Sequence, residues 1–368
     1  MGSTILAKKR KGNIEFLRFI FAFGIMLHHI SAFYPKMNFI GGYIGVDFFF
    51  MISGAFLAKS VSIHKESYAK ESFKITFSAS RNYIKRRILS VFPYFVLSTI
   101  IGYAVCFVAT GSVISPLYII NDFAFLIEFG FDAPSATGTT WFLSALFISL
   151  FLLYPIIRHY YEYYVRYIGV FVSLFIYGFL VYNYGMIGLS NEHIATFINA
   201  GVLRAIAGLS FGAIAFELSL IIISKVNNNK IIQIAISFAE FVLVILEFYL
   251  MHFDNRKLDQ IEVFIIFSLI TLLFSNKSHL CRVFENNFSR FLGKFSIVLF
   301  MNHFYWAKYL DSIIIKFQIS FLSEWYYRVI VVVLLSIATS IIVYLLICLY
   351  KFLMHSNRRR GKDKQCLT

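Results

Sequence analysis

Ten apolar runs, each about as long as a membrane-spanning helix, follow one another along this chain of 368 residues. A helix needs roughly 20 residues to cross the hydrocarbon core of a bilayer. Only 14% of the residues are charged, which is too few to cover a soluble domain of this size. We therefore exclude a single soluble core and predict an all-α, polytopic membrane helix bundle of about ten transmembrane helices. The predicted spans are 14–34, 42–62, 88–109, 139–158, 166–186, 200–224, 231–251, 259–275, 290–313 and 326–352.

The positions of the positive charges predict which way the bundle faces. Of the 34 Lys and Arg residues, 25 fall in segments on the same side of the membrane as the N-terminus, 6 on the other side and 3 within spans. Positive residues resist translocation, so both termini are predicted to be cytoplasmic. The net charge of +15 is spread over short loops, and no single patch for nucleic acid is predicted.

The sequence predicts one transmembrane domain, residues 1–356, followed by a basic cytoplasmic tail, 357–368, that we expect to be disordered. Residues 113–129 are apolar but interrupted by polar residues, so we place them at the outer interface. The longest cytoplasmic loop, 63–87, has aromatic residues between its charges and is predicted to be an amphipathic surface element. The four cysteines have no metal-ligand spacing, and neither a zinc site nor a disulfide framework is predicted.

The first span carries two ionisable residues, Arg18 and His29, whose burial in hydrocarbon costs several kcal/mol. Eleven helical residues turn through about 1100°, within about 20° of three turns, so the two share one face, about 16 Å apart. The orientation puts Arg18 near the cytoplasmic end and His29 nearer the outer end. His28 points about 100° away, and we assign it a structural function. The alternative is that Arg18 and His29 are paired or snorkelling structural residues.

The second span opens with a glycine-rich stretch, Gly41 to Gly54, that contains Asp47. The glycines allow close backbone approach and a tight turn. The hairpin centres near Asn38, nine residues from both His29 and Asp47, so these two are predicted to lie at similar depth. A carboxylate beside an imidazole fixes its tautomer and raises its basicity. We therefore predict that Asp47 contacts His29.

Other polar residues admit two interpretations each. Arg86 and Arg87 precede the third span and form either a positive-inside anchor or a phosphate clamp at the cytoplasmic mouth. Trp141 opens the fourth span, where tryptophan is more often an interfacial anchor. His303, in the ninth span, fits a structural or a functional assignment equally. Arg204 is about 220° from Glu217 on its helix, which disfavours a pair between them.

At these motifs the chain resembles the membrane acyltransferase-3 family, the ten-helix bacterial O-acyltransferases of cell-surface glycans. The match covers nearly the whole chain, and the first two motifs together are specific. The family's Arg-x10-His motif falls on Arg18 and His29, its Gly-Gly-x-x-Gly-Val-Asp-x-Phe-Phe-x-x-Ser-Gly motif on Gly41 to Gly54, its Arg-rich run before a proline on Arg86, Arg87 and Pro93, and its Leu-Gly-x-x-Ser…His motif on Leu292, Gly293, Ser296 and His303.

The chain departs from the family pattern at three points. Ser90 stands where the family has the second arginine of Arg-x-x-Arg, and Leu146 stands where some members have a glutamate. Many members also carry a C-terminal hydrolase-like domain, which is not expected here. Its absence favours an acceptor that is already lipid-linked or polymeric.

The resemblance implies that residues 1–356 are an acyltransferase domain in the bacterial cytoplasmic (inner) membrane. This domain would transfer an acyl group, usually acetyl, from cytoplasmic acyl-coenzyme A (acyl-CoA) to a hydroxyl of a surface glycan. His29 is the implied general base or acyl acceptor, with Asp47 orienting it. No metal is implied. The residues implied to bind the donor or the acceptor are Arg18, Arg86, Arg87, Ser53, Trp141 and His303.

A proton-coupled transporter or flippase of a glycan or small substrate is the main alternative, since it too would use buried His, Arg and Asp. It predicts internal repeats, which the sequence does not show, and no dependence on acyl-CoA. A structural scaffold would have no use for an ionisable pair such as His29 and Asp47.

Overall fold

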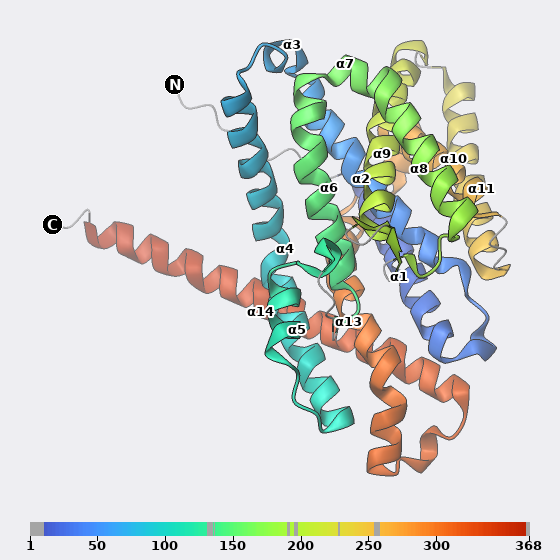
Figure 1. The fold of residues 1–368 in the computed structure, drawn as a ribbon, viewed down its shortest axis with the longest axis vertical. Helices are drawn as coiled ribbons and strands as arrows, with labels where there is room; N and C mark the ends of the chain where they lie inside the picture. Colours follow the sequence, from blue (N-terminus) through green and yellow to red (C-terminus); the bar gives the residue numbers. More distant parts are fainter. Residues whose placement is uncertain are drawn as a thin grey trace.

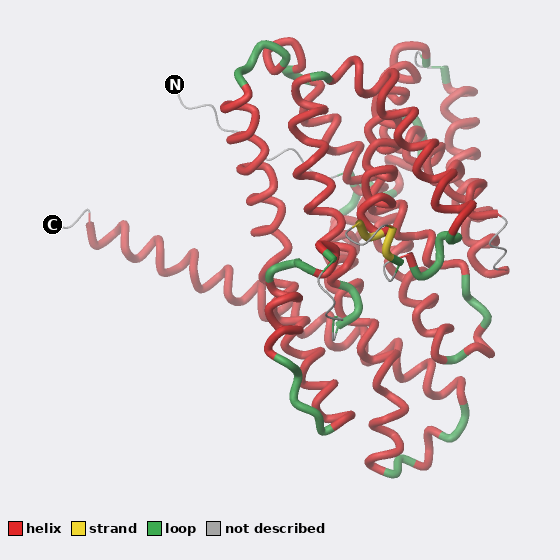
Figure 2. The backbone as a smooth tube through the Cα atoms, viewed as in Figure 1, coloured by secondary structure: helices red, strands yellow, loops and turns green. Residues whose placement is uncertain are grey.

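The computed structural model describes residues 11–130, 135, 137–189, 192–194, 198–226, 229–253 and 258–365, and it confirms the all-α prediction (Figure 1). The described part is a helical bundle with one short hairpin (Figure 2). Its main helices are α1 (Gly12–Phe33), α2 (Gly45–Ser62), α3 (Lys65–Tyr68), α4 (Phe73–Thr110), α5 (Pro116–Phe123), α6 (Thr140–His159), α7 (Tyr161–Tyr163), α8 (Gly169–Asn183), α9 (Ala200–Lys225), α10 (Lys230–Phe253), α11 (Asp259–Ser275), α12 (Leu280–Val283), α13 (Asn287–Phe317) and α14 (Trp325–Gln365).

Short 3-10 and π-helical segments and two strands complete the described elements. The strands β1 and β2 pair antiparallel between α8 and α9, and His193 faces Asn199 in their register. The sequence did not predict this hairpin. The segments are η1 (Pro35–Met37), η2 (Gly41–Ile44), η3 (Ile127–Phe129), η4 (Tyr164–Ile168) and η7 (Ser320–Leu322), and the strands are β1 (His193–Ile194) and β2 (Ile198–Asn199).

Every predicted span corresponds to a helix of the bundle. In the described part of the chain, eight helical stretches are long and apolar enough to cross a membrane, with η2 counted with α2, and α7 and η4 with α8. The remaining two predicted spans are α11, which has 17 residues, and α13, which has 31 residues and carries several charges. The chain is therefore a multi-pass membrane protein built from helices.

Two predicted segments differ from the structure in their limits. The loop 63–87 is mostly regular helix, because α4 starts at Phe73 and runs without a break into the third span. The tail predicted to begin at residue 357 continues as part of α14 through Gln365, and its last three residues lie outside the described part. The segment 113–129 contains α5, whose 8 residues are too short to cross a bilayer.

Glycines bring α2 and α9 into backbone contact. A Cβ atom added at Gly54 would lie 1.9 Å from the carbonyl oxygen of Leu209, and one added at Gly212 would lie 1.7 Å from that of Met51. No larger residue fits at either position without moving one helix away from the other. The close approach predicted for the glycine motif is therefore made with α9, and it sets which way the polar side chains of α2 point.

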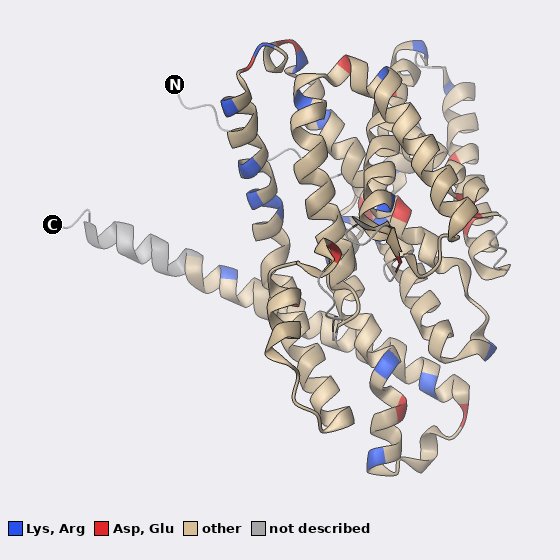
Figure 3. Cartoon of the chain, in the orientation of Figure 1, with Lys and Arg blue, Asp and Glu red and all other residues tan. Residues whose placement is uncertain are grey.

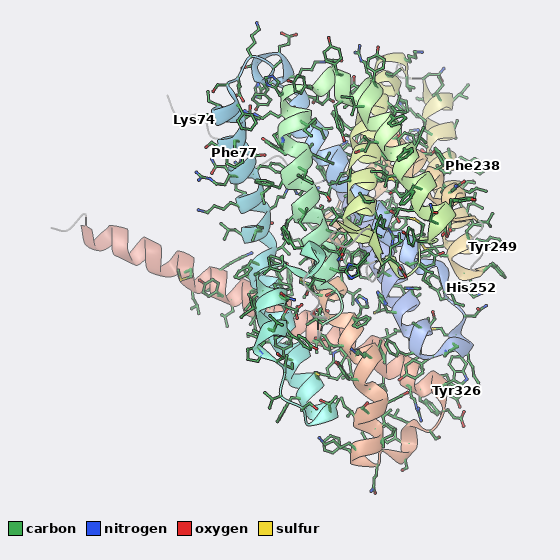
Figure 4. The ribbon with its side chains drawn as sticks, in the orientation of Figure 1. Lys74, Phe77, Phe238, Tyr249, His252 and Tyr326 are labelled. Atoms are coloured by element: carbon green, nitrogen blue, oxygen red, sulfur yellow. The ribbon has the colours of Figure 1, made fainter. Side chains whose placement is uncertain are left out.

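The outer faces of the bundle are apolar, and the positive charges gather toward its ends. Phe238 and Tyr249 point outward from α10, with exposed fractions of 68% and 58%, as lipid-facing side chains do (Figure 4). Lys and Arg residues follow one another along the first half of α4, near the end of the bundle that carries α3, and a smaller group lies at the opposite end on α13 and α14 (Figure 3). The end that carries α3 is the cytoplasmic one in the predicted orientation.

Candidate active site

Two cavities lie along the face of α1 that carries Arg18 and His29. The inner cavity, of about 150 Å³, is lined by Arg18, and the outer cavity, of about 420 Å³, is lined by His29. Both cavities are walled by α1, α2, α6 and α13. The eleven-residue spacing thus brings the two residues to one side of the helix, each in its own cavity.

The outer cavity combines aromatic surfaces with polar groups. Trp141, at the start of α6, lines this cavity, as does Lys308 of α13. Flat apolar surface beside a few fixed polar groups is typical of a site for a small polar ligand. The remaining polar or aromatic lining residues are His28, Tyr43, Ser135, Arg204 and Phe304.

His29 is held by aromatic rings and not by a carboxylate. Its ring stacks on that of His303 with centroids 5.1 Å apart and an interplanar angle of 25°. The ring of Phe304 meets it edge-on at 5.0 Å, and the ring of His28 lies at 5.0 Å on another side. His29 stays partly exposed to the cavity. These contacts restrict the rotation of the imidazole while leaving it accessible.

His303 is oriented by its own helix. Its Nδ1 atom lies 3.1 Å from the carbonyl oxygen of Leu299. A carbonyl oxygen only accepts, so Nδ1 carries the hydrogen and Nε2 of the neutral ring is an acceptor. That Nε2 atom is buried and has no hydrogen-bond partner in the described part of the chain. The Nε2 atom of His303, whose ring stacks on that of His29, is therefore a buried hydrogen-bond acceptor without a donor in the described part of the chain.

Asp47 does not pair with His29, which corrects the prediction made from the hairpin. Its carboxylate accepts hydrogen bonds from the Arg204 guanidinium at 2.5 Å and 3.2 Å and from the Tyr177 hydroxyl at 2.8 Å. Both charged side chains are buried, with exposed fractions of 0% and 2%. Equal depth in a hairpin does not fix the direction in which a side chain points, and the close packing of α2 on α9 turns Asp47 toward α9.

Arg204 is the residue that the sequence interpretation missed. It also donates to the carbonyl oxygens of Met186 at 3.0 Å and Tyr43 at 2.9 Å, so it joins α9 to α2, to η2 and to the segment that follows α8, beside the outer cavity. Glu217, considered as its partner, instead accepts from the Tyr161 hydroxyl. One signal could have found the pair: Asp47 and Arg204 are opposite charges in different spans, and buried charges need partners.

The inner cavity has a cationic mouth and an apolar interior. Arg87 of α4 lines it together with Ser53 of α2. The guanidinium of Arg87 donates to the Tyr83 hydroxyl at 2.9 Å. Arg86, by contrast, is exposed outside this cavity and donates to the carbonyl oxygen of Asn82. Of the three arginines predicted to bind substrate, Arg18 and Arg87 line this cavity and Arg86 does not.

Gly293 supports the position of Arg18. Arg18 forms an ion pair with Glu15, one turn earlier on α1, at 3.3 Å. A Cβ atom added at Gly293 would lie 2.0 Å from the Glu15 carboxylate, so α13 approaches α1 closely only because this position is glycine. The Leu-Gly-x-x-Ser motif therefore helps to hold the arginine at the inner cavity, and Ser296 lines the same cavity.

Glu128, in η3 between α5 and α6, is a buried carboxyl against the start of α9. A Cβ atom added at Gly201 would lie 2.6 Å from its Oε2 atom. Neither carboxylate oxygen accepts a hydrogen bond within the described part of the chain. Burial raises the pKa of Glu128 from 4.5 to about 8, although the nearby Asn199 side chain favours the charged form.

This shift predicts a pH-dependent stability. Between the ordinary pKa of 4.5 and the folded pKa of about 8, folded Glu128 keeps a proton that the unfolded chain releases. The free energy of unfolding should therefore fall as pH rises through this window, by about 1.4 kcal/mol per pH unit from this group. Glu128→Gln should remove that contribution. Unfolding temperatures of both proteins in detergent, compared across the window, test this, and parallel pH profiles would contradict it.

No group of three or more His, Cys, Asp or Glu side chains suited to a metal ion occurs in the residues that the structure describes. The prediction of a metal-free site stays a prediction. The assignments of Trp141, Ser53 and His303 to substrate binding likewise stay predictions, although each lies at or beside one of the two cavities.

Comparison with models of known protein families gives a match over most of the chain. A family model described as "Acyltransferase domain" matches residues 11–348, which is nearly the whole chain. Neither the curated proteins nor the solved structures give a match. The matched region contains both cavities and confirms the resemblance carried by the Arg18–His29 and Gly41–Gly54 motifs. The chain therefore belongs to the membrane acyltransferase-3 family.

Proposed function

We propose that this protein transfers an acyl group, usually acetyl, from cytoplasmic acyl-CoA to a hydroxyl group of a cell-surface glycan. The site of action would be the bacterial cytoplasmic membrane. The observation that carries the proposal is the pair of cavities along one face of α1 in a membrane acyltransferase. A charged inner mouth suits a phosphorylated donor, and a histidine in the outer cavity suits proton transfer from a hydroxyl.

The donor would enter through the inner cavity. Arg18 and Arg87 would meet the phosphates of the coenzyme, since guanidinium groups bind phosphate oxygens with paired hydrogen bonds. The hydroxyl of Ser53 and the apolar wall would face the extended pantetheine arm. Arg18 and His29 are about 16 Å apart along α1, and that arm is of the same order of length.

The acceptor would occupy the outer cavity. The indole of Trp141 and the ring of Tyr43 offer flat apolar surfaces to the C–H face of a sugar ring, and Lys308 offers a hydrogen-bond donor. Arg204, fixed by Asp47, would present its guanidinium edge to the same space. A lipid-linked or polymeric glycan fits this assignment.

His29 would carry the chemistry by one of two routes. As a general base it takes the proton of the acceptor hydroxyl while the oxygen attacks the thioester carbonyl carbon. The C–S bond then breaks, and the proton passes to the thiolate leaving group. As a nucleophile, the His29 nitrogen attacks the carbonyl carbon, the C–S bond breaks and the coenzyme leaves as a thiolate. The hydroxyl oxygen then attacks the acyl-imidazole, the N–C bond breaks, and the proton of the hydroxyl goes to the thiolate. In both routes His303 and Phe304 would hold the imidazole in place.

The direct test is incubation of the purified protein with radiolabelled acetyl-CoA and bacterial glycans. Label should appear in the glycan with the wild type and not with His29→Ala. Glycan movement across proteoliposomes without consumption of acetyl-CoA would overturn the proposal in favour of a transporter.

Arg87→Ala should raise the KM for acyl-CoA by about tenfold to about a hundredfold, because a hydrogen bond between charged groups contributes about 1.5–3 kcal/mol. The neighbouring Arg86→Ala is the matched control, since that side chain lies outside the inner cavity. Steady-state kinetics with varied acyl-CoA distinguish the two. Equal effects of both variants would mean that the arginines act only through surface charge.

A further inference from the structure

Three phenylalanine rings close the inner cavity at the end that faces the outer one. Phe49 of α2, Phe142 of α6 and Phe300 of α13 all line the inner cavity. The centroid of Phe142 lies 5.2 Å from that of Phe300, and Phe49 lies 6.2 Å from Phe300 and 6.3 Å from Phe142. All three side chains are nearly buried. We call these residues the phenylalanine cluster.

On each of the three helices, the residue of the phenylalanine cluster lies close to the point where the lining of the inner cavity ends and that of the outer cavity begins. Within one helical turn of each cluster residue, the same helix contributes a residue to the outer cavity: Val46 on α2, Trp141 on α6 and Phe304 on α13. At this level of the bundle the lining of the inner cavity is therefore followed by the lining of the outer cavity. A group that moves from one cavity to the other has to pass these rings or rest against them.

The cluster also touches the histidine pair. The ring of Phe300 lies 5.9 Å from that of His303, and His303 stacks on His29 at 5.1 Å. A thioester that reaches His29 from the inner cavity would thus bring its acyl group to the phenylalanine cluster. The space there is bounded by close-packed rings.

We propose that the phenylalanine cluster sets the length of the acyl group that this protein accepts, and restricts it to short chains. The inference rests on the proposed function. A close-packed interior resists added methylene groups, because each must displace a ring from its position. In a hydrophobic site, one methylene can change the rate by about 10-fold to about 200-fold. Longer acyl chains would be excluded at Phe49, Phe142 and Phe300 while the coenzyme binds as before.

Phe49 and Phe300 are the rings to change. Phe142 also packs against Phe50 at 4.8 Å and against Trp141 at 6.3 Å, so its loss would disturb the outer cavity as well. Leucine keeps each site apolar and replaces the phenyl ring with a smaller branched side chain. Phe216→Leu is the matched control, because that ring is also nearly buried but packs against Phe274 and lines neither cavity.

The experiment measures kcat/KM with acetyl-, butyryl- and octanoyl-CoA for the wild type, Phe49→Leu, Phe300→Leu and Phe216→Leu, by the acyl groups transferred to a glycan acceptor. The wild type should prefer acetyl-CoA. Phe49→Leu and Phe300→Leu should each raise the octanoyl-to-acetyl ratio by about tenfold or more, and Phe216→Leu should leave the ratio unchanged.

Failure of this inference differs from failure of the proposed function. If Phe49→Leu and Phe300→Leu are active but keep the wild-type octanoyl-to-acetyl ratio of kcat/KM, the cluster does not select chain length. The same conclusion follows if the wild type uses octanoyl-CoA and acetyl-CoA with equal kcat/KM. If the wild type transfers no acyl group from any donor, the proposed function falls and the inference with it. Two variants on different helices guard against the misfolding of one, and a monodisperse elution profile checks each.

Discussion

Replacement of His29 by alanine should abolish acyl transfer while leaving the protein folded in the membrane. The imidazole is the proton acceptor or the nucleophile of the proposed reaction, and it faces the outer cavity. General acid–base catalysis contributes about 10²- to 10⁴-fold, so the rate should fall by at least that factor. The contacts of His29 with His28, His303 and Phe304 are ring packing, and the alanine variant keeps the helix backbone intact. The measurement is transfer of radiolabel from acetyl-CoA to glycan.

The control for this variant is His252→Ala, since His252 is exposed at the end of α10 (Figure 4). It should transfer acetyl groups as the wild type does. A second measurement separates the two routes. If His29 takes the acyl group, the wild type incubated with labelled acetyl-CoA alone should retain label on the protein, and His29→Ala should not. Acetylation of glycan at the wild-type rate by His29→Ala would contradict the mechanism.

Asp47→Asn or Arg204→Met alone should destabilise the protein strongly. Each change leaves the remaining group of a buried ion pair without its opposite charge, which typically costs about 3–5 kcal/mol. The pair joins α2 to α9, and Arg204 also bonds to the carbonyl oxygens of Tyr43 and Met186. We expect a much lower yield of folded protein and a lower unfolding temperature for each single variant.

The double variant Asp47→Leu/Arg204→Met should recover much of that stability. Replacing both charges with apolar groups removes the cost of an unpaired buried charge, and such replacements are often neutral. Unfolding temperatures of the two single variants and the double variant form the test. Losses that simply add in the double variant would show that the ion pair is not the source of the effect. A single variant as stable as the wild type would contradict the buried pair.

The sequence placed Arg18 and His29 correctly relative to each other because both lie on one continuous helix. Helical periodicity fixes the angle between two side chains of one helix, and the structure puts each in a cavity on the shared wall. The prediction for Asp47 needed the angle between two helices. That angle depends on which helices pack together, and Gly54 and Gly212 pack α2 against α9.

For the arginines before the third span, too, the sequence alone did not predict the direction of each side chain. Arg86 and Arg87 are adjacent in the sequence, and their residue type alone gives no reason to prefer one. Since α4 continues as a helix through both, they point about 100° apart, and only Arg87 faces the inner cavity. The prediction of a loop at 63–87 gave no helical angle between Arg86 and Arg87, so it could not separate their directions.

The sequence by itself determined the class of the fold and the family, because composition and motif spacing are properties of single segments. The orientation of the helices, which rests on charge asymmetry, stays a prediction. Tertiary structure decided the partners: Arg204 for Asp47, the aromatic neighbours of His29, and the phenylalanine cluster between two cavities. Each of these contacts joins residues from helices far apart in the chain. Their formation depends on the packing of helix faces, which no single segment specifies.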